Sequence, residues 1–207
     1  MKSTLSFLAA ALLLLAAASP AQAWMDTSPN EVPGAPIRIV AADTLPDGLA
    51  DFLRDYVQKN AKVGVDLVVA PVDAEKPLDE AARAAALTAD SSDGAEKAVA
   101  TIVVAKSADE RRVSARPDEA FAVLNTSRLG GDSLALDLLE GRAGQEVLRE
   151  LAILLGVEPC PFPLCVLTGY SDPAELDEMS DNYCPPCFER IRHAMLERGG
   201  HILAIPD

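Results

Sequence analysis

Apolar residues follow two kinds of spacing along the chain, and together these spacings predict strands that alternate with helices. Continuous apolar runs are typical of buried strands, whereas apolar residues three or four positions apart are typical of amphipathic helices. Four runs predict strands: Ile37–Ala42, Val65–Ala70, Val99–Ala105 and Ala120–Leu124. Two stretches between them predict helices: Asp47–Asn60 and Asp79–Ala89. Such an alternation predicts a layered α/β domain.

The last third of the chain begins with a strong helical pattern from about residue 143. The apolar residues on one side of this predicted helix are Val147, Leu148, Leu151, Leu154 and Leu155. Gly156 stands where a left-handed residue commonly ends a helix. A Pro-rich, irregular stretch follows, and a short helix is predicted to open at Asp172 with Pro173 in its first turn. A final helix is predicted over Phe188–Arg198.

The N-terminal residues have the pattern of a secretory signal peptide. Lys2 gives a positive start, Leu5–Ala18 is an almost unbroken Ala/Leu run, and Ala21-Gln22-Ala23 is a small-x-small cleavage site. The apolar run is short for a membrane span. We therefore expect residues 1–23 to be a signal peptide, residues 24–207 to form one domain, and the protein to be secreted or periplasmic. An uncleaved N-terminal anchor is the alternative.

The charge balance argues against nucleic acid as a partner. The net charge of the chain is −14, and it becomes −15 when Lys2 leaves with the signal peptide. An acidic surface repels phosphate backbones, and no basic stripe in the sequence offsets this repulsion. No segment after residue 23 is apolar enough to span a membrane. We expect no nucleic-acid partner, and no membrane association once the signal peptide is cleaved.

All four cysteines are close together in the sequence, at Cys160, Cys165, Cys184 and Cys187. Disulfides are expected in an exported protein, and four cysteines allow three pairings. Two close pairs of thiols can also hold a metal ion. The Cys-Pro-Pro-Cys spacing admits a redox interpretation as well, although no thioredoxin-like βαβ pattern flanks it.

The spacing of these cysteines behind Glu150 and Gly156 matches a known motif. Cys160 and Cys165 have four residues between them, and Cys184 and Cys187 form a later Cys-x-x-Cys pair. In these residues the sequence resembles the archaemetzincins, a family of zinc-dependent metzincin-type peptidases. Their motif is H-E-x-x-H-x-x-G-x-x-H-C-x4-C-x-M, followed by C-x-x-C. Residues 122–129 are also similar to the family's strand before the active-site helix.

The chain departs from the family motif at every histidine. When the motif is placed on Cys160 and Cys165, Glu150 falls on the catalytic glutamate and Gly156 on the glycine. The three zinc-binding histidines fall on Arg149, Ile153 and Pro159, and the methionine falls on Leu167. Arginine is permanently cationic, and isoleucine and proline carry no donor side chain. The sequence contains only two histidines, His193 and His201, and both follow the last cysteine.

The resemblance implies a single metzincin-like α/β domain with a mixed sheet, a long active-site-type helix and a smaller C-terminal part tied by the four cysteines. It also implies one structural zinc ion on Cys160, Cys165, Cys184 and Cys187, and no catalytic zinc. The predicted function is therefore that of an exported pseudo-peptidase that binds a peptide or a protein. Two alternatives stay open: an active zinc peptidase with non-standard ligands, and a disulfide-tied structural protein without metal.

Glu150 has two interpretations. It is either a general base left without its metal, or an ordinary helix glutamate that pairs with a neighbour or faces solvent. Arg149 and Glu150 could also line a polar groove that binds a peptide without cutting it.

Overall fold

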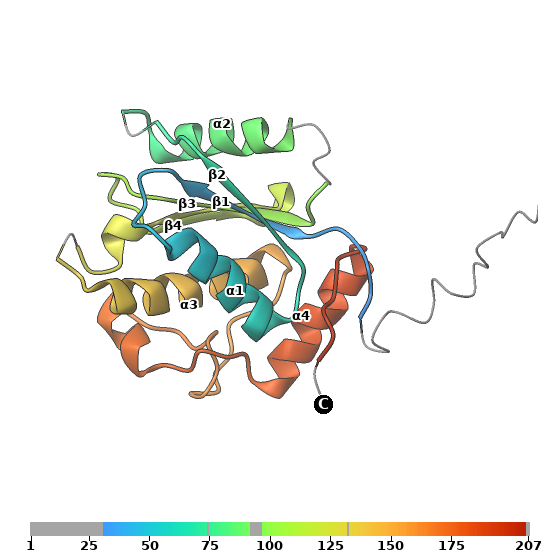
Figure 1. The fold of residues 1–207 in the computed structure, drawn as a ribbon. Helices are drawn as coiled ribbons and strands as arrows, with labels where there is room; N and C mark the ends of the chain where they lie inside the picture. Colours follow the sequence, from blue (N-terminus) through green and yellow to red (C-terminus); the bar gives the residue numbers. More distant parts are fainter. Residues whose placement is uncertain (1–30, 74, 92–96, 132, 206–207) are drawn as a thin grey trace, which may run out of the picture.

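A five-stranded sheet forms the centre of the fold (Figure 1). The computed structural model describes residues 31–73, 75–91, 97–131 and 133–205, so the predicted signal peptide lies outside the described residues. The strands are β1 (Ile37–Ala42), β2 (Val65–Ala70), β3 (Ala100–Ala105), β4 (Val113–Arg116) and β5 (Phe121–Asn125). Their order is β2-β1-β3-β5-β4, with β4 antiparallel to β5 and the other neighbours parallel. The predicted α/β class with a mixed sheet is thus confirmed.

Helices cover both faces of this sheet. The helices are α1 (Leu49–Ala61), α2 (Leu78–Asp90), α3 (Leu136–Leu154) and α4 (Pro185–Glu197), with short 3-10 turns η2 (Pro117–Glu119), η3 (Thr126–Arg128) and η4 (Pro173–Glu178). In Figure 1, α2 lies on one side of the sheet and α1 and α3 lie on the other. Successive strand residues point to opposite faces. Ile37 and Ile39 of β1 therefore pack in the core with α1 and α3, whereas Val40 and Ala42 pack with the alanines of α2.

The predicted elements agree with the structure for the four parallel strands and the two helices between them. β1 and β2 have the predicted bounds, and α1, α2, β3 and β5 differ from prediction by at most two residues at either end. Strand β4 was not predicted. It is only four residues long, all four of them are half-buried, and it carries Ser114 and Arg116, so it lacks the apolar run of a buried strand.

Helix α3 begins earlier than the sequence pattern indicated. It starts at Leu136 rather than near residue 143. Its first turns expose Leu136 and Leu138, and Gly141 and Gly144 lower the helix propensity of the segment. Gly144 has a packing reason, because a Cβ built there would lie 2.7 Å from the Tyr56 ring of α1. The close approach of α1 to α3 therefore requires a glycine at this position.

The end of α3 has the predicted left-handed cap. Gly156 has a φ of 78°, and the N–H of Val157 donates to the carbonyl of Ala152 at 2.8 Å. This is the hydrogen-bond pattern of a Schellman motif, which turns the chain away from the helix axis. The turn leads into residues 157–167, the segment that carries the first two cysteines.

The described parts of the two chain ends lie beside each other. Val32 pairs with Ile202 and Ala35 pairs with Gly200, and in Figure 1 the N-terminal segment runs next to the C-terminal one. Gly34 permits this approach, since a Cβ there would lie 2.4 Å from the carbonyl oxygen of Gly199. His201 adds a side-chain contact with Glu31 at 3.2 Å.

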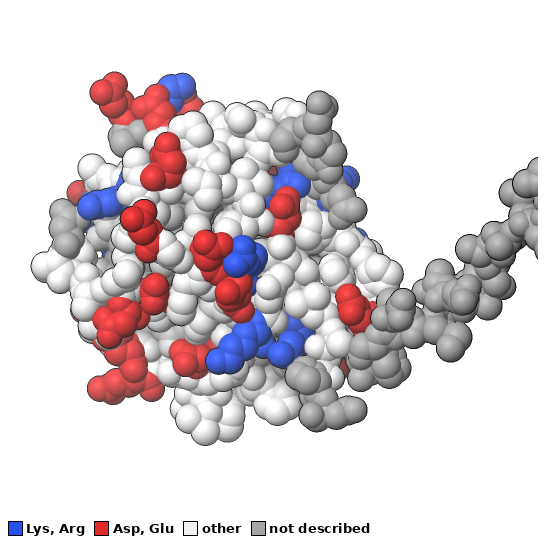
Figure 2. Space-filling view, viewed as in Figure 1, with Lys and Arg blue, Asp and Glu red and all other residues white. Residues whose placement is uncertain are grey.

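The surface carries many acidic side chains. Figure 2 shows them spread over the visible face, with fewer basic side chains between them. None of the helices among the described residues is long and apolar enough to cross a membrane.

Candidate metal centre and an adjoining charged cluster

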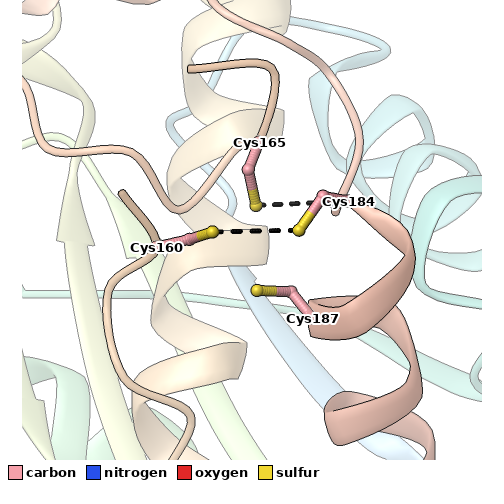
Figure 3. A group of neighbouring side chains, drawn as sticks. All are labelled: Cys160, Cys165, Cys184 and Cys187. Atoms are coloured by element: carbon pink, nitrogen blue, oxygen red, sulfur yellow. Dashed lines mark hydrogen bonds between the residues drawn. The ribbon is translucent and has the colours of Figure 1, made fainter. Parts of the chain in front are cut away.

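The four cysteines converge on one point between the end of α3 and the start of α4 (Figure 3). One sulfur atom from each of Cys160, Cys165, Cys184 and Cys187 lies within 4.8 Å of the other three. Cys160 is half-buried and the other three are buried. Within the described residues, this is the one group of three or more His, Cys, Asp or Glu side chains close enough to share a metal ion.

Local backbone structure positions each cysteine. The N–H of Cys160 donates to the Leu167 carbonyl, and the N–H of Cys165 donates to the Phe162 carbonyl, which closes the loop between the two residues. Cys184 is the N-cap residue of α4, and Cys187 lies in the first turn of that helix. Two prolines fill the turn between them, where missing N–H groups cost no helical hydrogen bond. For this reason α4 begins three residues before the predicted Phe188.

The donor set fits a tetrahedral zinc ion. Zinc–sulfur bonds of about 2.3 Å place tetrahedral sulfur atoms roughly 3.8 Å apart. The sulfur atoms of Cys160 and Cys184 are 3.8 Å apart. The backbone N–H of Cys184 also points at the sulfur of Cys165, at 3.4 Å, as outer hydrogen bonds to metal-bound thiolates do. The thiols are free in the structure, and 3.8 Å is far from the roughly 2.05 Å of a disulfide bond.

The pKa values of three of the thiols are shifted, and not all in the same direction. Burial raises the pKa of the Cys165 thiol and the pKa of the Cys187 thiol. At Cys184 burial acts in the same direction, but hydrogen bonds, first of all from Cys187, outweigh it and lower the pKa. Cysteines bind a metal ion as thiolates, so the charge of a bound cation would offset the cost of ionising the buried thiols.

The residues at the family's catalytic-zinc positions, where no catalytic zinc was predicted, do not converge on one point. Glu150 lies on the buried side of α3 and is only 3% exposed, whereas Arg149 is half-buried. Ile153 is 39% exposed, and Pro159 is exposed beyond the end of the helix. The two histidines of the sequence are elsewhere: His193 contacts Glu197 on α4, and His201 contacts Glu31. The suggestion that Glu150 faces solvent is therefore wrong.

Arg149 links α3 to the segment that follows Cys165. Its Nη1 atom donates to the carbonyl of Val166 at 2.5 Å and to the carbonyl of Thr168 at 2.7 Å. Its guanidinium also lies over the Tyr170 ring, 4.8 Å from the ring centre. Arg112, which directly precedes β4, lies over the same ring at 4.7 Å. Two cations and one aromatic ring thus occupy the space beside α3.

Two buried glutamates lie next to this stack. Glu146 and Glu150 are one helical turn apart on α3, and they are 2% and 3% exposed. Burial, followed by the charge of Glu146, raises the pKa of Glu150 to about 8. Burial also raises the pKa of Glu146, although Arg149 and Arg112 act against it. Arg112 is the nearest cation to Glu146, with 3.7 Å between Nε and Oε1.

Sequence reasoning missed Glu146, Arg112 and Tyr170. The burial of Glu146 could have been predicted from the sequence, because Glu146 lies on the buried side of α3 with Val147 and Glu150. No pattern in the sequence indicates Arg112 or Tyr170, because they come from loops that only the folded chain brings together.

Asn125 holds the loop that carries Arg112. This residue is fully buried, and its side-chain amide donates to the carbonyls of Ser107, Asp109 and Arg111. Its Oδ1 accepts the N–H groups of Ser107 and Ser127. A side chain used in this way fixes the path of residues 107–111, and so the place where Arg112 enters the cluster.

Known proteins resemble this chain in structure. No protein-family model matches the chain, and no curated protein matches it. Archaemetzincin from Methanopyrus kandleri has a TM-score of 0.59 at 20% identity, covering 78% of this chain and 96% of its own. A zinc-dependent peptidase from Methanocorpusculum labreanum has a TM-score of 0.61 at 15% identity, with coverages of 75% and 99%. Archaemetzincin from Archaeoglobus fulgidus, complexed with malonate, has a TM-score of 0.53 at 15% identity, with coverages of 74% and 99%. At these identities the likeness concerns the fold, and the chain has the archaemetzincin fold.

Proposed function

We propose that the protein is an exported, archaemetzincin-like pseudo-peptidase that keeps a structural zinc ion and binds a peptide or a protein. The observation that carries this proposal is the position of Arg149. It stands where the resemblance puts the first zinc-binding histidine, and its guanidinium is already bonded to the carbonyls of Val166 and Thr168. A fixed cation at this point opposes a catalytic metal ion. The nearby Glu150 would then have no metal-bound water to deprotonate.

The zinc ion in this proposal has a structural role. Cys160, Cys165, Cys184 and Cys187 would hold it in a closed site with no position left for water or substrate. When bound, it would supply folding free energy by joining the end of α3 to the start of α4. The described residues offer no second group of this kind.

Strand β4 offers a means of binding a peptide. It lies at the edge of the sheet and, among the described strands, pairs only with β5. The N–H of Asn125 donates to the carbonyl of Arg112, so in an antiparallel pair the backbones of Val113 and Ala115 face away from β5. An extended peptide can add to an exposed strand edge through such groups. Arg112 and the Tyr170 ring lie next to this edge.

The first test counts zinc and free thiols in the same sample of the purified chain. One zinc per chain, released when the thiols are blocked, is the expected result. Two metal ions per chain would contradict the pseudo-peptidase and favour a zinc peptidase with non-standard ligands. No metal and no free thiols would contradict the zinc site and favour the disulfide-tied alternative.

The second test addresses peptide binding at β4. A peptide is selected on the protein from a random library, and its affinity is then measured for Ala115→Pro and for Ala115→Ser. Proline removes the outward N–H of residue 115 without breaking a bond to β5, whereas serine keeps that N–H. We expect the proline variant to bind about tenfold more weakly, or worse, and the serine variant to bind normally. Equal losses in both variants, or a library that yields no binder, would contradict binding at this edge.

A further inference from the structure

A hollow opens at the carboxyl ends of three neighbouring strands of the sheet. Strands β1, β3 and β5 are parallel, so the loops that follow them lie at the same edge. Thr44 follows β1, Lys106 follows β3 and Ser127 follows β5, and all three line a cavity of about 490 Å³. The cavity also reaches the start of α3, which lies at this end of the sheet in Figure 1. In open α/β sheets, this edge is where ligands commonly bind.

A second hollow adjoins the first. Its volume is about 580 Å³, and it shares four lining residues with the first cavity: Thr44, Lys106, Ser127 and Gly131. The rest of its wall comes from Arg128 and from the loop that follows β3. Because the two hollows have these walls in common, one ligand of moderate length can occupy both. We call the pair of hollows the strand-end site.

The two hollows differ in chemistry. The first is rich in aliphatic side chains, and its leucines are Leu45, Leu134, Leu136 and Leu139. The second is lined by two cations, Lys106 and Arg128, and by no carboxylate among the described residues. The chain as a whole has a net charge of −14, so the charge of this hollow is opposite to that of the molecule. The strand-end site is therefore apolar in one part and positive in the other.

Neutral groups hold the guanidinium of Arg128 in place. Its Nε donates to the carbonyl of Asp109 and its Nη2 donates to the carbonyl of Ala108, both at 2.7 Å. The carboxylate of Asp109 pairs with Arg111 instead. Among the described residues, no carboxylate forms an ion pair with Arg128, and no hydrogen bond uses its Nη1. A guanidinium fixed in this way is preorganised to bind a carboxylate.

We propose that the strand-end site binds an aliphatic monocarboxylate. The carboxylate lies beside Arg128 and Lys106 in the second hollow, and the aliphatic group packs on the leucines of the first, where burial of methylene groups supplies affinity. Ser127 adds a donor, because its hydroxyl makes no hydrogen bond within the described part of the chain. Asp47 lines the first hollow and would repel a second negative charge, so the ligand carries one carboxylate.

Two kinds of molecule carry this chemistry. One is a free aliphatic acid, and the other is a peptide whose C-terminal residue is aliphatic. The lining residues include neither the four cysteines nor any residue of β4. The strand-end site therefore does not depend on the proposed function, and it is tested without zinc binding or the β4 edge as a readout.

The test titrates the whole purified chain with octanoate and follows its backbone amide resonances by NMR. We expect saturable shifts at Thr44, Ser127 and Gly131. Octan-1-ol lacks the charge, and octanedioate has a second carboxylate for Asp47 to repel, so each should bind about tenfold more weakly or worse. N-acetylalanyl-leucine separates the two sources. If it binds at the same residues, the site accepts a peptide C-terminus, and if octanoate alone binds there, the ligand is a free acid.

Two pairs of variants locate the binding. Leu136→Asn should weaken octanoate binding about tenfold, whereas Leu138→Asn should not. The two leucines are 45% and 40% exposed at the start of α3, but only Leu136 lines the site, so neither change disturbs the core. Lys106→Met should weaken binding to a similar extent, and Lys59→Met, on α1, should leave it unchanged.

Three outcomes would each overturn the proposal. They are equal affinities for octanoate and octan-1-ol, equal effects of the two leucine variants, and no saturable shift at octanoate concentrations up to about 10 mM. None of them depends on a variant that fails to fold, because the first and third use the unmodified chain. Such a failure would leave the zinc count and the β4 test unaffected.

Discussion

At the scale of single residues, the unusual feature is a pair of carboxyl groups buried one turn apart on α3. Glu146 and Glu150 are almost fully buried. Of the nearby arginines, Arg149 donates to a backbone carbonyl, and Nε of Arg112 is 3.7 Å from Oε1 of Glu146. A glutamate on an exposed face of the helix would keep its hydration and would have no desolvation cost. A buried one makes the stability of the protein depend on pH, because folding changes the affinity of the carboxyl group for its proton.

The first prediction concerns this pH dependence. The pKa of Glu150 is raised on folding from 4.5 to about 8, so the folded state holds a proton that the unfolded state releases across this window. The contribution of Glu150 to stability is therefore fully present below pH 4.5 and is lost as pH rises to about 8. The slope is about 1.4 kcal/mol per pH unit, or roughly 3 kcal/mol between pH 6 and pH 8. Urea unfolding at a series of pH values measures it.

Glu150→Gln should remove most of this slope, because glutamine does not titrate. Glu140→Gln should leave the slope in place. A flat stability profile in the unmodified chain between pH 6 and pH 8 would show that folding leaves the pKa of Glu150 in its normal range, and would contradict this prediction.

At the scale of elements, the packing of α1 against α3 depends on a missing side chain. The ring of Tyr56 lies against the backbone of α3 at Gly144, and its hydroxyl is 3.1 Å from a carboxylate oxygen of Asp181. Gln145 of α3 donates to the same carboxylate. The glycine therefore fixes the distance between two helices, while Asp181 joins both of them to the segment before α4.

The second prediction compares two glycines of α3. Gly144→Ala should destabilise the protein by about 1–3 kcal/mol, because the new methyl group meets the Tyr56 ring at 2.7 Å. Gly141→Ala should stabilise it by about 0.5–1 kcal/mol, because nothing lies within 4 Å and alanine favours the helix. Denaturant midpoints measure both effects. If both substitutions stabilise the protein, helix propensity, and not the contact with α1, governs these positions.

At the scale of the whole molecule, the four-cysteine centre joins the sheet domain to the C-terminal helix. The third prediction is that removing zinc weakens this junction. A chelator under reducing conditions should lower Tm by about 10 °C or more, since metal-binding free energy in such sites is folding free energy. Restoring zinc should restore Tm. A Tm that the chelator does not change would argue against a structural metal ion.

Much of the fold could be predicted from the sequence, because buried parallel strands and the packed side of α3 have characteristic spacings of apolar residues. The Gly156 cap was predictable for a similar reason, since a left-handed backbone favours one residue type. Strand β4 was not, because its partner β5, and not its own composition, makes it a strand.

The candidate site was likewise predictable in part. The four cysteines could be grouped by spacing alone, whereas the cluster around Tyr170 depends on contacts between loops far apart in sequence. The burial of the Glu150 side chain could have been predicted from the sequence, because Glu150 lies on the same side of the helix as Leu151 and Val147. What spacing could not indicate is that Arg149 would use its hydrogen bonds on carbonyls and leave its neighbour without a partner.

The pairing of the two chain ends has a consequence for circular permutation. Val32 and Ala35 find their partners at Ile202 and Gly200, so a short linker between the described ends would join residues that are already neighbours. During synthesis, Val32 and Ala35 cannot make these pairs until residues 200–202 have left the ribosome, so this closure of the fold belongs to its last steps.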